Sequence, residues 1–197
     1  MTGVQTCALP ISTGNLDVLA NWGTSTDGTG TAPSNFTAAS QIFNIRNRTT
    51  ATIGAAWTVS GTNSKVILGD VTVAAINFTV PSGFAFAGTI DIAAASSSTN
   101  TLTIQNTTIP TFGILNAGST VDYNGSAITQ LITVANYGNL TLSGSGTRTF
   151  PSGIVGIAGT FSPGTFTSAT QGTINFSSAS SQTVPAFTYF NLTAHPR

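Results

Sequence analysis

Apolar and polar residues alternate along short segments through most of the chain. Ile90 and Ile92 alternate with Thr89 and Asp91, and the same pattern recurs in Thr-Val-Asp-Tyr over 120–123. Such alternation predicts β-strands with one packed face and one polar face. No apolar stripe at helical spacing accompanies it. The pattern therefore predicts an all-β protein.

The predicted strands are short and closely spaced, and Gly, Pro, Asn or Ser separates nearly every pair. They cover residues 41–46, 57–60, 65–68, 76–80, 89–92, 101–105, 120–123, 139–142, 147–150, 154–157, 173–176 and 189–193. Regular short strands with frequent turns are typical of sandwiches, barrels and solenoids.

Strand spacing distinguishes between these architectures. The strands that begin at Ile76, Thr101, Thr120 and Asn139 follow one another at similar intervals. Coils of about 18–25 residues, the length that these intervals imply, favour a right-handed parallel β-helix, a β-solenoid in which each coil packs on its neighbours. A β-sandwich is the alternative, because it explains the alternation equally well.

An internal repeat supports stacked coils. Residues 118–126 (GSTVDYNGS) resemble 172–178 (GTINFSS), and 137–141 (YGNLT) resemble 189–193 (YFNLT). The step from Val121 to Ile174 and the step from Tyr137 to Tyr189 differ by a single position. A near-constant offset is the signature of a repeat architecture. We expect the copies to be two of several coils in a longer stalk.

Composition removes several classes of function. Only 5% of residues are charged and the net charge is +0, which argues against electrostatic binding of nucleic acid or anionic lipid. The 40% hydrophobic content argues against disorder. No apolar run approaches the roughly 18 residues of a membrane span, so no membrane insertion is expected. Arg46 and Arg48, the one close pair of cations, are interpreted as exposed strand positions.

The first residues differ in character from the rest. Residues 1–11 (MTGVQTCALPI) resemble the translation of a sequencing adapter, so residues 1–12 are predicted to be an artefactual leader and are set aside. Met1 and Cys7 then belong to this leader, and disulfides and cysteine metal sites are excluded. We expect an N-terminal cap over 13–50 and solenoid repeats over 51–197, truncated at the C-terminus, in a fragment of a longer protein.

Several segments carry a resemblance. Residues 21–37 (NWGTSTDGTGTAPSNFT), 41–47 (QIFNIRN), 56–61 (AWTVSG) and 137–146 (YGNLTLSGSG) resemble the repetitive stalk or adhesin regions of large bacterial cell-surface proteins exported by type IX secretion. The resemblance implies an extracellular, cell-surface location. It implies no catalytic residues.

Few residues offer catalytic chemistry. His195 is the single histidine and lies at the end of the chain, so no nucleophile–base triad is expected. Asp91 and Asp122, with Asp70, are the candidate carboxylates of a polysaccharide-cleaving site, if their coils stack in register. Asp27 or Asp70 could contribute to a calcium site. Trp22 and Trp57 are interpreted as core residues rather than as a sugar-stacking platform.

An ice-binding face is a further alternative, because Thr-x-Thr units could form a flat ladder on one side of a solenoid. Such units occur at 101–103, 147–149 and 165–167. They do not recur at one coil position, and Arg148 and Phe166 interrupt two of them, so this function ranks lowest.

The sequence thus predicts a non-enzymatic structural or adhesive stalk segment of a secreted bacterial surface protein. No catalytic, cofactor-binding or metal-binding residue is predicted. The expected partners are neighbouring domains of the same longer chain, with glycans or cell surfaces as further candidates. A polysaccharide-binding or polysaccharide-cleaving β-helix is the main alternative.

Overall fold

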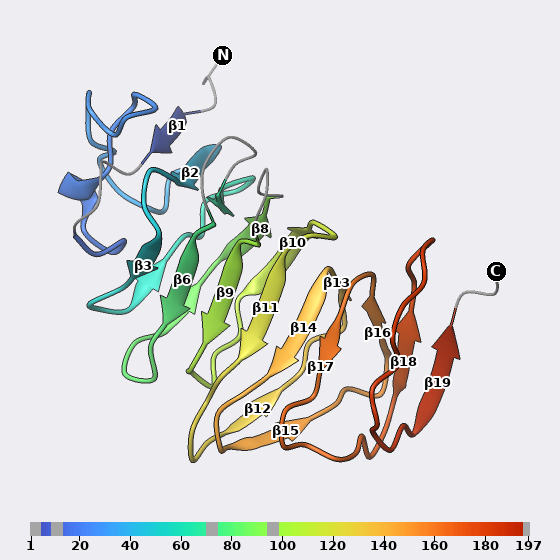
Figure 1. Ribbon diagram of the computed structural model, residues 1–197. Coiled ribbons are helices and arrows are strands. Elements are labelled where there is room, and N and C mark those ends of the chain that lie inside the picture. The colour runs from blue at the N-terminus through green and yellow to red at the C-terminus, as the bar shows by residue number, and fades with distance from the viewer. Residues whose placement is uncertain (1–4, 9–13, 70–74, 94–98, 195–197) are drawn as a thin grey trace.

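The protein is a parallel β-solenoid of about seven turns (Figure 1). The computed structural model describes residues 5–8, 14–69, 75–93 and 99–194. One short 3-10 helix, η1 (Leu19–Asn21), accompanies the strands of this part of the chain. The predicted all-β class and β-solenoid fold are confirmed.

Two long sheets form most of the walls. The five-stranded sheet has the order β1-β2-β5-β8-β10 and consists of β1 (Gln5–Ala8), β2 (Gln41–Ile45), β5 (Lys65–Leu68), β8 (Thr89–Ile92) and β10 (Thr111–Leu115). The six-stranded sheet has the order β17-β14-β11-β9-β6-β3 and consists of β3 (Thr50–Thr52), β6 (Asn77–Val80), β9 (Thr101–Ile104), β11 (Thr120–Tyr123), β14 (Asn139–Leu142) and β17 (Phe161–Ser162).

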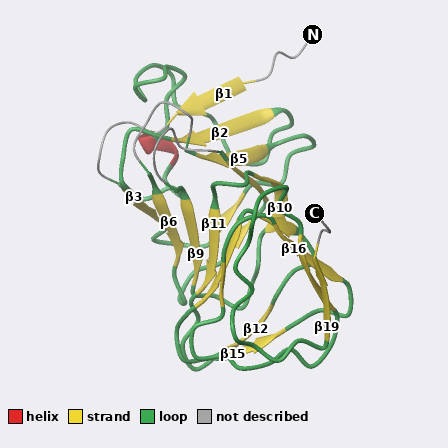
Figure 2. Ribbon diagram, turned by 45° about the vertical axis from the view of Figure 1, so that its right-hand side comes forward, coloured by secondary structure: helices red, strands yellow, loops and turns green. Residues whose placement is uncertain are grey.

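Three smaller sheets complete the coils. A four-stranded sheet contains, in this order, β13 (Asn136–Tyr137), β16 (Ile154–Ile157), β18 (Thr173–Phe176) and β19 (Asn191–Ala194). Two strand pairs form the third side: β4 (Trp57–Thr58) with β7 (Phe86–Ala87), and β12 (Thr129–Leu131) with β15 (Thr147–Thr149). The turned view shows strands on different sides of the coil at the C-terminal end (Figure 2).

Every pairing between the described strands is parallel, which excludes the sandwich alternative because Greek-key sheets are antiparallel. Parallel neighbours need a long crossover connection, and here the rest of each coil supplies it. Coils shorten along the chain. The coil that carries Ala51 to its register partner Phe78 is slightly longer than predicted, whereas the coil from Ile157 to Phe176 lies within the predicted range.

The inward side chains stack into a continuous apolar core. Phe78, Leu102, Val121, Leu140 and Phe161 are successive register partners across the six-stranded sheet, and all are buried. Each large apolar side chain removed from water contributes roughly 1.5–3 kcal/mol. The alternation in the sequence therefore reports which face of each strand the core covers.

An aromatic cluster fills the N-terminal coil. Trp22 lies 5.1 Å from Phe43 and 5.8 Å from Trp57 between ring centroids, and Trp57 lies 4.8 Å from Phe86. Trp22 and Trp57 are 2% and 1% exposed, so their interpretation as core residues is confirmed. The Trp22 indole N–H donates to the Leu16 carbonyl at 2.8 Å, which anchors the segment that leads into the first coil.

The N-terminal segments join the solenoid directly. β1, from the segment set aside as a leader, pairs with β2 from Gln5 opposite Gln41 to Ala8 opposite Asn44. β2 in turn pairs with β5, so the region expected to be a cap contributes a strand of the five-stranded sheet. β1 covers the edge of β2 that would otherwise be an open pairing edge.

Glutamine side chains hydrogen-bond across two corners of the solenoid. Gln130 is fully buried, and its Oε1 accepts the Gly125 N–H at 2.9 Å. Its Nε2 donates to the carbonyls of Ile104 and Asn106, each at 2.8 Å. These bonds join the turn after β11 to the turn after β9 in the preceding coil. The side chain thus replaces strand pairing at a place where the backbone changes direction.

Gln182 makes the equivalent three contacts in the second copy of the repeat. Its Oε1 accepts the Ser178 N–H at 2.8 Å, and its Nε2 donates to the carbonyls of Ile157 at 2.9 Å and Gly159 at 2.6 Å. The internal repeat in the sequence therefore corresponds to a strand followed by a corner whose backbone groups hydrogen-bond to a glutamine side chain.

The two copies of the repeat are not equivalent coils. β11, in the first copy, belongs to the six-stranded sheet, whereas β18, in the second copy, belongs to the four-stranded sheet. They occupy different sides because the repeat offset is longer than two of the C-terminal coils and shorter than three. The second copy is displaced by one side of the solenoid.

Candidate functional site

The candidate carboxylates do not form a pair. Asp91 lies on β8 of the five-stranded sheet, and Asp122 lies on β11 of the six-stranded sheet. The expectation that their coils could stack in register is therefore wrong, since the two strands belong to different sides of the solenoid. Asp70 lies outside the described residues. The pairing of carboxyl groups that glycoside hydrolysis requires is absent between Asp91 and Asp122.

Asp91 has a structural role at a β-bulge. The register of β8 and β10 shifts between Phe112 and Leu115, so Gly113 and Ile114 both lie opposite Asp91. Asp91 Oδ1 accepts the Ile114 N–H at 2.8 Å, and Oδ2 lies 2.6 Å from Lys65 Nζ. The side chain of Asp91 is 11% exposed. A bulge leaves a backbone group without a ladder partner, and this carboxylate supplies one.

Asp122 lies half-buried on the outward face of β11. Its Oδ1 accepts a hydrogen bond from Ser143 Oγ at 2.6 Å. Burial raises the pKa of Asp122 above its ordinary value, although the Ser143 hydrogen bond and the nearby Arg148 lower it. Both partners come from the next coil, because Ser143 directly follows β14 and Arg148 lies on β15.

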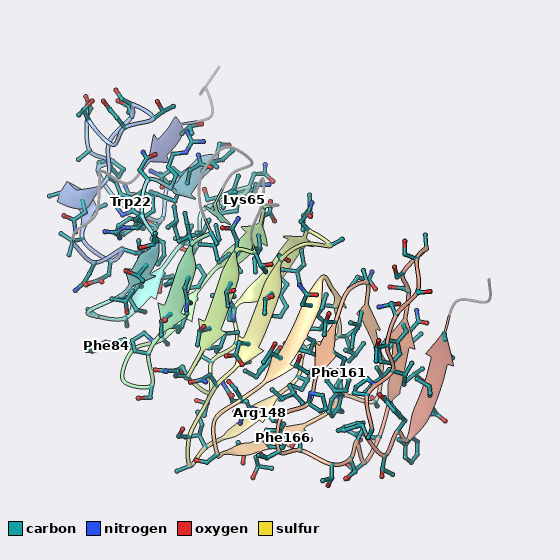
Figure 3. All side chains as sticks on the ribbon, viewed as in Figure 1. Trp22, Lys65, Phe84, Arg148, Phe161 and Phe166 are labelled. Carbon is teal, nitrogen blue, oxygen red and sulfur yellow. The ribbon has the colours of Figure 1, made fainter. Side chains whose placement is uncertain are left out.

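Arg148 links the backbone at the same corner through its guanidinium group. It is the register partner of Gln130 and is buried. Its guanidinium donates to the carbonyls of Tyr123 at 2.8 Å and Gly125 at 2.9 Å, and also to Ser143. The ring of Phe166 lies 5.1 Å from the guanidinium carbon, and Figure 3 shows the two side chains together. Burial lowers the pKa of Arg148, and the guanidinium stays charged.

Two tyrosine hydroxyls share a bond inside the core. Tyr123 and Tyr137 are buried, and their hydroxyl oxygens lie 2.9 Å apart. The Tyr137 hydroxyl donates to the Thr133 carbonyl at 2.8 Å, and the Tyr123 hydroxyl accepts the Thr133 N–H at 3.1 Å. Burial raises the pKa of both groups. The pair thus satisfies its own hydrogen bonds within the core and has a structural role.

The remaining sequence candidates lie apart from one another. Asp27 is exposed and accepts the N–H and hydroxyl of Thr29, which is a local turn. Arg48 is buried and donates to the Gly14 carbonyl at 3.1 Å, so its interpretation as an exposed position is wrong. Arg46, just beyond β2, is half-buried. His195 lies outside the described residues.

Polar residues line a broad groove on the surface. It has a volume of about 590 Å³ and lies where the turn after β4 meets the start of β5 and of β8. Its lining includes Ser60, Asn63, Ser64, Lys65, Thr89 and Thr111. Among the described residues, no three His, Cys, Asp or Glu side chains gather where they could hold a metal ion. No described helix has the length and apolar character needed to cross a membrane.

The outward face of the six-stranded sheet is a regular polar surface. Its strands lie side by side (Figure 1), and the register places their outward residues in two files. Of the three Thr-x-Thr units considered in the sequence analysis, 101–103 lies on this sheet, whereas 147–149 forms β15 and 165–167 lies outside the named strands. A further unit, 50–52, forms β3 of the same sheet. Asn77, Asn139 and Ser162 also belong to the files, and only the strand register identifies them as members.

Comparison with known proteins gives no match to a family model, to a curated protein or to a solved structure. The class of protein is therefore defined by the fold, which is a parallel β-solenoid, and function is argued from its surfaces.

Proposed function

We propose that the chain is a rigid, non-enzymatic stalk segment of a secreted bacterial surface protein. The observation that carries the proposal is the lateral pairing of parallel strands from coil to coil, with side-chain seals at the corners between coils. Each coil contacts mainly its neighbours, so the architecture extends in one dimension. Each coil adds about 4.7–4.9 Å to the length.

The proposed location and partners follow from the resemblance of segments such as 21–37 and 137–146 to stalk regions of exported cell-surface proteins. The stalk would carry neighbouring domains of the same longer chain. Its neutral, Thr- and Asn-rich surface suits weak, repeated contact with glycans or cell surfaces. The sequence offers no clustered cations for nucleic acid.

Mechanical resistance is the direct test of a stalk. The chain is placed between two handles and pulled in a single-molecule force experiment, with a small helical domain as the reference. Lateral strand pairing along the whole stack predicts unfolding at a higher force than the reference. Unravelling at the reference force or below contradicts the stalk role.

A polysaccharide-binding or polysaccharide-cleaving module is the alternative, and the polar groove beside Lys65 favours its binding form. A glycan array and a reducing-sugar assay distinguish these functions. We expect weak glycan binding without turnover. Glycan cleavage that is lost in Asp91→Asn or Asp122→Asn, with the fold retained, would overturn the non-enzymatic proposal.

A further inference from the structure

The outward face of the six-stranded sheet carries two parallel files of small polar side chains. The first file consists of Thr50, Asn77, Thr101, Thr120 and Asn139, and the second of Thr52, Thr79, Thr103, Asp122, Thr141 and Ser162. Within each file, successive residues come from successive strands and are direct register partners. The surface is therefore a two-dimensional grid, mostly of threonine, in which Thr103 is buried and the other members are exposed or half-buried.

The grid has fixed spacings. Parallel strands lie about 4.7–4.9 Å apart, and residues two apart on one strand lie roughly 6.6 Å apart. A soluble protein or a single flexible glycan chain does not present a matching repeat in two directions. The face of a crystal does. The periodicity thus indicates a crystalline ligand rather than a discrete partner.

The side chains of the grid are held in place before any ligand arrives. Threonine is β-branched and stiff about its first side-chain torsion. Thr103 Oγ1 donates to Asn77 Oδ1 at 3.0 Å, and Asn139 Nδ2 donates to Thr120 Oγ1 at 3.3 Å, so grid neighbours also fix one another. Little rotamer freedom remains to be lost on binding, which favours association.

The chemistry of the grid fits a neutral, hydrogen-bonded lattice. Asp122 is its single ionisable side chain, and the hydroxyl groups both donate and accept. A crystalline polysaccharide is expected to use aromatic stacking, but the exposed aromatic rings Phe84 and Phe190 lie outside this sheet. Water fits better, because each hydroxyl can hold a water while the adjacent methyl group restricts where that water lies.

We propose that this face binds the surface of ice. The hydroxyl and amide groups hold a layer of water at regular spacing, and that layer continues into the ice lattice. Many weak contacts act together over the rigid face, so adsorption is persistent although each contact is small. The inference goes beyond the stalk role and does not depend on it.

The test measures thermal hysteresis, the gap between melting and freezing points, and partition of the purified chain into growing ice. Thr120→Tyr places a bulky ring in the middle of the grid. Thr129→Tyr is the matched control, since Thr129 is exposed on β12, outside the six-stranded sheet. Should Thr120→Tyr fail to fold by circular dichroism, Thr141→Tyr repeats the test on the next strand in the second file.

We expect the unmodified chain to show thermal hysteresis and to enter ice, Thr120→Tyr to lose most of both, and Thr129→Tyr to keep them. The proposal is overturned if the folded chain shows no thermal hysteresis, or if the grid and control variants lose it equally. It is also overturned if the chain binds crystalline cellulose or chitin but not ice.

Discussion

The buried glutamine at the corner after β11, Gln130, gives the sharpest test of how the coils are held together. In Gln130→Leu the side chain keeps a similar volume but loses its three hydrogen bonds. Ile104 retains a partner for its carbonyl, because that oxygen also accepts the Asn124 N–H at 2.8 Å. The groups left without the glutamine are the Asn106 carbonyl and the Gly125 N–H.

The magnitude follows from how deeply these two groups are buried. The bond to the Gly125 N–H is buried, whereas the bond to the Asn106 carbonyl is part-buried and its oxygen can be reached by water. A buried polar group that loses its partner costs about 1–3 kcal/mol, so Gln130→Leu should lower the free energy of unfolding by about that amount. This is a large part of the roughly 5–15 kcal/mol typical of native proteins. The loss arises at a corner where no strand pairing can compensate.

Gln182→Leu is the matched control, since Gln182 makes the equivalent three bonds but is only half-buried. Water can reach its freed groups, and we expect a loss below about 1 kcal/mol. Urea unfolding followed by circular dichroism measures both variants. Equal losses at the two positions, or a loss for Gln130→Leu as small as that expected for Gln182→Leu, would refute the reasoning.

Three further predictions concern single positions. The folded pKa of Asp122 is raised above its usual 3.8, so the stability that this carboxyl contributes is fully present below the unfolded pKa and is lost as pH rises through the folded pKa. Asp122→Asn should therefore be more stable than the unmodified chain at pH 7. The urea midpoints of the two proteins should converge below about pH 4. Lys65→Met removes the cation beside the mostly buried Asp91 and should lower the free energy of unfolding by about 1–2 kcal/mol. The same substitution should lower it by less when Asp91→Asn is already present, and thermal unfolding of the single and double variants measures the difference. Gly138→Ala places a Cβ against the Asn116 carbonyl oxygen and should lower stability by more than about 2 kcal/mol, whereas Gly83→Ala, with open space around it, should leave the unfolding midpoint within experimental error.

Alternation in the sequence predicts the strands that form the core, because an inward residue must be apolar wherever a coil packs on its neighbour. It misses strands that are too short to alternate, such as β7 and β13. It also misses β10, since the bulge at Gly113 and Ile114 breaks the period. In each case, pairing with a neighbouring coil defines the strand, and local sequence does not.

The surfaces were harder to predict than the core. Which strands share a sheet depends on coil length, and coils shorten from the N-terminal register partners to the C-terminal ones. For this reason Asp91 and Asp122 could not be separated, and the two polar files could not be assembled, from the sequence. The Thr-x-Thr pattern identifies 101–103 and 50–52 but not the strands between and beyond them, because Asn77 and Asp122 also occupy grid positions.

The shortening of the coils has a consequence for how the stack forms. Every coil adds about the same height to the stack, and the C-terminal coils span that height with less chain. Bringing two strands together loses less loop-closure entropy when the chain between them is shorter. The strands of the C-terminal coils should therefore pair with a slightly smaller entropy loss than those of the N-terminal coils, where the aromatic cluster around Trp57 supplies packing energy.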